Sequence, residues 1–171
     1  MPSALNSALK QSKCDISAIV EALSEENSIT ELRITQKASK RLISILKEEI
    51  DKSNSFQKVL KVLSILSQND IIVNQIVNSG PDLSSICDKL LSKAISSKKG
   101  DIFDQKSLAI IFDLINQSDK LKSQLCMSIQ EYILTSIEQK SIQNSLLPKS
   151  MEILVSSVTH HQENRTFFIK N

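Results

Sequence analysis

Glycine, proline and aromatic residues are scarce in this 171-residue chain, which has two Gly, three Pro, one Tyr and no Trp. Hairpins and sheets depend on turns that are rich in Gly and Pro, so this scarcity disfavours a β fold. With only Gly80 and Gly100, the chain also lacks a glycine-rich loop that could cradle the phosphates of a nucleotide. The few aromatic side chains disfavour a single-stranded nucleic-acid surface built on base stacking. Ile, Leu, Ser and Lys dominate instead, and we expect an all-α fold.

Residues that carry catalytic or metal chemistry are equally few. His160 and His161 are the only histidines, and neighbouring side chains on a helix point about 100° apart, so the pair cannot chelate one metal from one face. Cys14, Cys87 and Cys126 show no metal-ligand spacing, and their odd number favours free thiols in a reducing compartment. We therefore expect no metal, no cofactor and no enzymatic activity.

Net charge and hydropathy indicate which partners and which cellular compartment to expect. The net charge of +2 is too small to argue for nucleic acid or an anionic membrane. The N-terminus has no long apolar run, which predicts neither a signal peptide nor a membrane helix. An intracellular protein of the cytoplasm or nucleus is expected.

The stretch Phe56–Leu91 shows the clearest helical pattern. Its first part has apolar residues at spacings of three and four, which predicts a helix with one buried stripe. Asn69 is a suitable N-cap for a short helix over Asp70–Ser79. Gly80 suits the left-handed residue that ends a helix, and Pro81 suits the first turn of the next one.

Residues 74–91 read N-Q-I-V-N-S-G-P-D-L-S-S-I-C-D-K-L-L. This order of an Asn, a short apolar run, a Gly and a Leu-rich helix resembles an armadillo repeat. The resemblance implies a right-handed α-solenoid of about three to four armadillo/HEAT-like repeats. The ends of the predicted third helices are Leu23, Leu66, Ile115 and Val158, at intervals of 43, 49 and 43 residues. The Gly-Pro break occurs once, so HEAT-like or irregular helical repeats stay open.

Periodicity predicts helices along the rest of the chain. We expect one nearly unbroken helix over Asp119–Gln139, whose apolar set includes Ile137. In the last strong helix, which Leu147-Pro148 opens, Met151 and Val155 are expected to face inward. The remaining predicted helices are a frayed one over 1–13, then 15–23, 27–34, 37–50, 56–66, 70–79, one from Gly80-Pro81 toward Ser96, one from Asp101 or Asp104 to Asn116, and one beginning at His160.

The resemblance implies that the third helices line a concave groove. On the clearest repeat the polar stripe is Gln57, Lys61, Ser64 and Gln68, and Glu21 and Glu25 precede it in the first repeat. The same offsets place Lys106, Asp113, Gln117, Lys149, Ser156 and His160 on the later repeats. The lysines favour a peptide or helix with acidic residues, although a solvated face is equally consistent with the pattern. We interpret the chain as a non-enzymatic scaffold or adaptor that binds a protein partner in this groove.

Two alternatives concern the chain's end and its basic residues. The repeat registration stops inside a unit, so Phe167, Phe168 and Ile169 would need further helices or a partner to cover them. Residues 1–171 are therefore expected to form a single helical-repeat domain that is the N-terminal part of a longer superhelix, or one that docks end-on into a larger complex. A helical nucleic-acid-binding module would instead use four basic residues whose field Glu48 and Glu49 weaken, namely Lys37, Lys40, Arg41 and Lys47.

Overall fold

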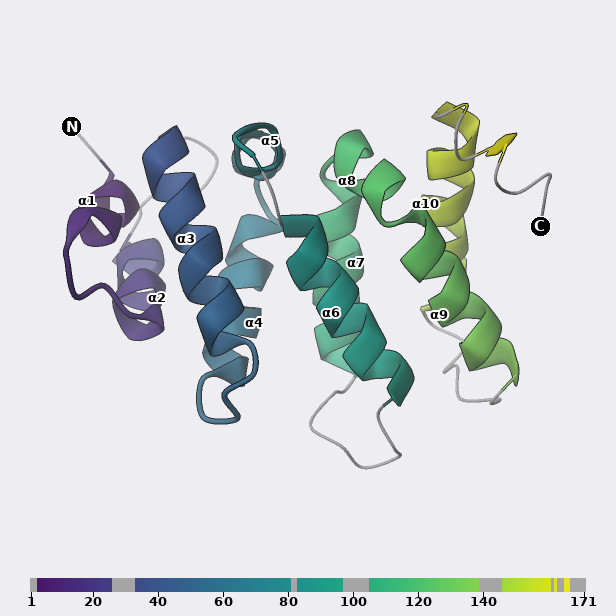
Figure 1. Cartoon of the computed structure of the whole chain (residues 1–171), viewed down its shortest axis with the longest axis horizontal. Helices are drawn as coiled ribbons and strands as arrows, with labels where there is room; N and C mark the ends of the chain where they lie inside the picture. The colour runs from purple at the N-terminus through teal and green to yellow at the C-terminus, as the bar shows by residue number, and fades with distance from the viewer. Residues whose placement is uncertain are drawn as a thin grey trace. The chain divides into compact units, whose positions relative to one another are not determined.

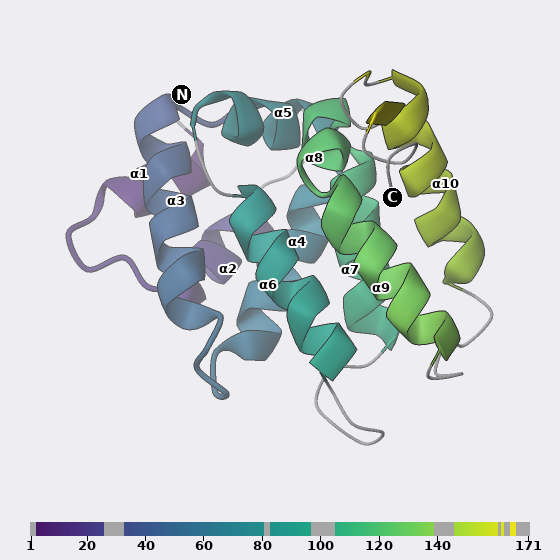
Figure 2. The same ribbon diagram turned by 45° about the vertical axis from the view of Figure 1, so that its right-hand side comes forward.

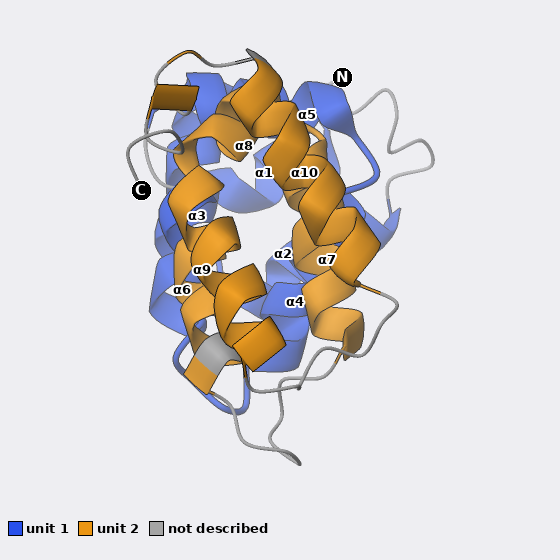
Figure 3. Cartoon of the chain, turned by 90° about the vertical axis from the view of Figure 1, so that its right-hand side faces the viewer, with its two compact units in different colours: residues 1–86 blue, residues 87–171 orange. Residues whose placement is uncertain are grey.

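The computed structural model describes residues 3–25, 33–80, 83–96, 105–138, 146–160, 162 and 165–166. This part of the chain is helical throughout its regular structure and contains no strand, which confirms the all-α prediction. It divides into two compact units, unit 1 over residues 1–86 and unit 2 over residues 87–171 (Figure 3). The single-domain interpretation stays a prediction.

Unit 1 contains five helices in its described part: α1 (Ala4–Lys10), α2 (Ile16–Glu25), α3 (Gln36–Glu49), α4 (Phe56–Leu66) and α5 (Asp70–Asn78) (Figure 1). Helix α1 packs against α2 and α3, α2 packs against α4, and α3 packs against α5. Neighbouring helices thus bury one another's apolar sides. The largest fully buried side chains of unit 1 are Leu5, Ile19, Leu23, Leu42, Leu46, Ile50, Leu63, Leu66, Ile72, Ile76 and Leu83.

Side-chain caps fix where α1, α3 and α5 begin. The hydroxyl of Ser3 accepts a hydrogen bond from the Asn6 N–H at 3.2 Å, and the hydroxyl of Thr35 accepts one from the Ala38 N–H at 3.2 Å. Asn69 accepts from the Ile72 N–H at 3.0 Å, which confirms the predicted cap of α5. After α5, Gly80 has a φ of 129°, a conformation that residues with a Cβ rarely adopt.

Helix α6 (Leu83–Ser96) begins at the end of unit 1 and continues into unit 2. The other described helices of unit 2 are α7 (Gln105–Asn116), α8 (Asp119–Gln124), α9 (Cys126–Glu138) and α10 (Leu147–His160) (Figure 2). Helix α10 packs against α7, α8 and α9. At the centre of the unit, the rings of Phe112 and Tyr132 meet edge to face with their centroids 5.5 Å apart.

The helix predicted as nearly unbroken over Asp119–Gln139 is divided into two helices at Leu125. That residue leaves the helical conformation, with φ of −105° and ψ of 5°, and ends α8 before α9 begins at Cys126. Leu121, Leu125 and Ile129 are all buried, so the apolar period continues across the break and conceals it.

Two further expectations need correction. Ile137, Met151 and Val155 are exposed rather than inward-facing, as described below. Residues 33 and 34, the end of the predicted helix over 27–34, are not helical, and the rest of that helix lies outside the described residues. The predicted cap at Asp101 or Asp104 also lies outside them.

Candidate functional site

The predicted groove residues of unit 1 lie on or next to α4. Gln57, Lys61 and Gln68 are exposed and Ser64 is half-buried. Their spacings of four, three and four place them along one side of the helix. Glu21 and Glu25, which the prediction placed in the first repeat, are exposed on α2. These positions are open to solvent, and their role in binding stays a prediction.

The predicted groove residues of unit 2 lie on or next to α7 and α10, and two of them pair with each other. The Lys149 ammonium forms an ion pair with the Asp113 carboxylate, which joins α10 to α7. Both side chains are partly exposed, so the pair stabilises the fold by about 1 kcal/mol at most. An acidic ligand at Lys149 would have to compete with Asp113.

The remaining predicted residues differ in how far they are described. Lys106 is exposed, whereas Gln117 and Ser156 are half-buried. His160 ends α10, but its side chain lies outside the described part. The predicted assembly edge also lies outside it: Phe167, Phe168 and Ile169.

Three of the exposed large apolar side chains in the described part of the chain lie on α9. Met127 is 62% exposed, Leu134 is 52% exposed and Ile137 is 55% exposed. Glu131 and Glu138 are exposed on the same helix. Apart from the neighbours Ile137 and Glu138, the five residues follow one another at spacings of three or four, so they share one side of the helix. We call these five residues the α9 face. The sequence of α9 contains no Lys, Arg or His, so this face is apolar and acidic.

Sequence reasoning missed the α9 face because it assigned one apolar stripe to each helix. The opposite side of α9 buries Ile129, Tyr132 and Ile133 in unit 2. A helix that is apolar on two sides is expected to be covered on both. The sequence feature that could have revealed the α9 face is the presence of apolar residues outside the buried stripe, at Met127, Leu134 and Ile137. Helix α10 adds Met151 and Val155, which are also exposed.

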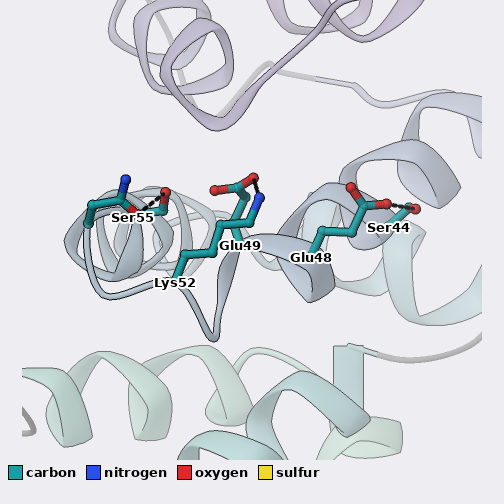
Figure 4. A network of polar contacts seen from close by, with 6 residues as sticks. Ser44, Glu48, Glu49, Lys52 and Ser55 are labelled. Carbon is teal, nitrogen blue, oxygen red and sulfur yellow. Dashed lines mark hydrogen bonds and ion pairs between the residues drawn. The ribbon is translucent and has the colours of Figure 1, made fainter.

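The acidic pair of exposed Glu48 and half-buried Glu49 makes separate local contacts (Figure 4). Ser44 donates a hydrogen bond to Glu48 at 3.3 Å, and the Lys52 ammonium lies 2.6 Å from Glu49. The hydrogen bond from Lys52 and a weaker one from the Ser55 hydroxyl lower the pKa of Glu49. A carboxyl with a lowered pKa is poorly suited to act as a general acid at neutral pH.

The thiols show no activation toward nucleophilic chemistry. Burial raises the pKa of Cys87 to about 12, with a smaller contribution from Asp88. Burial also raises the pKa of Cys126, although a hydrogen bond with Ser157 opposes it, and it raises the pKa of the half-buried Cys14. A thiol nucleophile needs a lowered pKa. Among the described residues, no group of three or more His, Cys, Asp or Glu could hold a metal ion.

Comparison with known proteins gives this chain no family, since no family model, no curated protein and no solved structure matches it. The armadillo/HEAT-like resemblance therefore stays a prediction. No described helix has both the length and the apolar content needed to cross a membrane.

Proposed function

We propose that this chain is a non-enzymatic helical-repeat scaffold that binds an amphipathic helix of a protein partner on its α9 face. The α9 face carries the proposal because its three apolar side chains are each more than half exposed. Scattered exposed apolar residues are ordinary on protein surfaces, but several at helical spacing on one side of one helix match the anchors of helix recognition.

The charges of the α9 face indicate the chemistry of the partner. Glu131 and Glu138 flank Leu134, and α9 has no cation to neutralise them. A partner helix with apolar residues at spacings of three and four, bordered by Lys or Arg, would bury the apolar anchors and pair with the carboxylates. An acidic partner helix would be repelled. The preferred partner on this face is therefore basic, in contrast to the acidic peptide that the predicted groove favours.

The packing within each unit supports the repeat part of the proposal. In unit 1, α2 packs against α4, and in unit 2, α7 packs against α10. These are pairs of predicted third helices that are one repeat apart in the sequence. A row of repeats produces this packing, because each repeat buries its apolar side against the next one. An α-solenoid is the architecture that we propose on this basis.

A designed peptide tests the binding face directly. The probe is a fluorescent amphipathic helix with leucines at spacings of three and four and flanking lysines, and a second peptide carries glutamates in place of the lysines. We expect the basic peptide to bind the full chain and the acidic one to bind at least about tenfold more weakly, measured by fluorescence anisotropy. The double change Leu134→Gln and Ile137→Gln should abolish binding of the basic peptide.

Two control variants separate the α9 face from other surfaces. Ile71→Gln changes an exposed apolar residue of unit 1, and Lys61→Glu changes a predicted groove residue. Both should bind the basic peptide like the unmodified chain. The proposal for the α9 face is wrong if the double variant still binds, or if both peptides bind equally. Self-association of the chain that disappears in the double variant would replace the partner helix by a second copy.

A further inference from the structure

A hollow of about 360 Å³ lies in unit 1, between the end of α1 and the start of α3. Leu9 and Ala38, both buried, form its apolar floor. Three cationic side chains line it, Lys10 from α1 and Lys37 and Arg41 from α3, and no acidic residue does so. The other lining residues are Gln11, Ser12 and Thr35. The hollow thus joins a concentrated positive charge to several hydrogen-bonding groups.

The two sides of the hollow are held in place by hydrogen bonds to the backbone of residues 33–35. Buried Asn6 donates to the Arg33 carbonyl at 2.7 Å and accepts from the Thr35 N–H at 3.2 Å. Gln75 of α5 accepts from the Ile34 N–H at 3.1 Å. These bonds fix the residue that caps α3, and they set the start of α3 against α1.

Two of the lining cations, Arg41 and Lys37, occupy positions that suit an anion. The Arg41 guanidinium donates one hydrogen bond to the Ser12 carbonyl at 3.2 Å, which anchors it while leaving other N–H groups of its five to bind a ligand. Lys37 lies in the first turn of α3, a helix of 14 residues, where the helix dipole also favours negative charge. The nearest acid in sequence, Asp15, accepts from the Ala18 N–H at 2.9 Å at the start of α2.

We propose that this hollow binds a phosphomonoester group. A phosphomonoester carries about −1.5 to −2 charges at neutral pH and three acceptor oxygens, which match three cations better than a carboxylate does. The Arg41 fork can hold two of the oxygens, and the lysines supply the remaining charge. Because the hollow is larger than a phosphate alone and opens to solvent, the group would be carried by a larger molecule, whose apolar part would rest on Leu9 and Ala38.

Titration calorimetry of the full chain tests this site with three probes. They are a phosphoserine peptide, the same peptide without phosphate, and adenosine monophosphate. We expect at least one phosphorylated probe to bind and the unphosphorylated peptide not to bind. Preference for the peptide would identify a phosphorylated protein as the source, and preference for the nucleotide would identify a small metabolite. Arg41→Gln should weaken binding at least about tenfold, the cost of one charged hydrogen bond.

Lys40→Gln is the matched control, because it removes one positive charge from the same helix. The Lys40 side chain lies near Gly80 rather than in the hollow, so binding should fall less than about twofold, as expected from screened charges. Arg41→Lys keeps the charge and removes the fork, and it should give an intermediate affinity. Equal losses in Arg41→Gln and Lys40→Gln would overturn the proposal in favour of a general attraction for polyanions. Failure of both phosphorylated probes to bind would overturn it as well.

The test is independent of the proposed partner-helix site. The hollow lies in unit 1 and the α9 face in unit 2. Loss of phosphate binding in Arg41→Gln should leave the basic-peptide binding unchanged, and the double change on α9 should leave phosphate binding unchanged.

Discussion

Units 1 and 2 bury their cores alike but treat their surfaces differently. Among the described residues, exposed large apolar side chains are found once in unit 1, at Ile71, and five times in unit 2. Both units have side-chain hydrogen bonds between elements distant in sequence, but in unit 1 several of them go to backbone groups. Asn6 bonds to residues 33 and 35, Gln75 bonds to residue 34, and Lys58 bonds to Ser17 at 2.8 Å.

The difference separates two ways in which a helical protein can use its polar groups. In unit 1, the amides of buried Asn6 and half-buried Gln75 bond to a non-helical stretch of backbone, which is stable only if its N–H and C=O groups have partners. In unit 2, the inter-helix ion pair between Lys149 and Asp113 is partly exposed, and apolar groups face solvent on α9 and α10. Unit 1 is thus suited to hold a small group in a fixed hollow, and unit 2 to bind an apolar surface.

The largest effect on stability should come from changing Asn6, because its side chain makes several of the long-range hydrogen bonds of unit 1. Asn6→Ala removes its bonds to the Arg33 carbonyl, the Thr35 N–H and the Ser3 hydroxyl. We expect the free energy of unfolding to fall by about 1–3 kcal/mol, since part-buried hydrogen bonds to the backbone of residues 33 and 35 are lost. Urea unfolding followed by circular dichroism, read from the midpoint at constant slope, measures the change.

Ser128→Ala is the corresponding change in unit 2. Ser128 donates to Asp88, but Asp88 is exposed, so its loss should alter stability by less than about 0.5 kcal/mol. Similar costs for the two variants would contradict the contrast between the units.

Helix positions were largely predictable from the sequence because period and caps agree. Asn69 caps α5 as expected, α7 ends at Asn116, and α10 opens at Leu147-Pro148. The break at Leu125 could not be found in this way. It changes the direction of the chain without changing the spacing of apolar residues, and neither Gly nor Pro marks it.

The two candidate sites depend on contacts that a single sequence does not reveal. Lys37 and Arg41 were grouped from their spacing on one helix, but Lys10 joins them only because α1 packs against α3. Pairing of Lys149 with Asp113 likewise follows from the packing of α10 on α7. The exposure of Ile137, Met151 and Val155 depends on tertiary packing, because no other part of the described chain covers them. The spacing of apolar residues along a helix does not reveal which side of the helix has a neighbour.

A smaller effect, of opposite sign in the two units, should come from two buried helix serines. Within the described residues, the Ser39 hydroxyl of α3 is buried without a hydrogen-bond partner. Ser39→Ala should therefore raise the free energy of unfolding by about 1 kcal/mol, from relief of the unpaired hydroxyl and the better helix propensity of Ala.

Ser157 of α10 is the matched residue, equally buried but bonded to the Leu154 carbonyl at 2.8 Å and to Cys126. Ser157→Ala should give no gain and a loss of up to about 1 kcal/mol in the same urea titration. A gain in both variants would mean that helix propensity alone decides the outcome.

The smallest effect on stability at neutral pH is expected from the cysteines. Here the difference in exposure is reversed, because the more exposed thiol lies in unit 1. Cys14 of unit 1 is half-buried, whereas Cys87 of unit 2 is fully buried and has its pKa raised from 9.0 to about 12. The folded state thus retains the thiol proton where the unfolded chain has lost it. Its stabilising contribution is complete below pH 9 and is lost as the pH rises from 9 towards 12.

Between about pH 8 and pH 10 the Cys87 thiol should cost the folded state about 1 kcal/mol. The measurement is urea unfolding across this range for the unmodified chain and for Cys87→Ala, in which the other titrating groups are unchanged. We expect a steeper alkaline loss in the unmodified chain by that amount. If the free energy of unfolding falls equally with pH in both proteins, the Cys87 thiol is accessible to water in the folded state. Solvent exposure in unit 2 would then extend from α9 and α10 into its core.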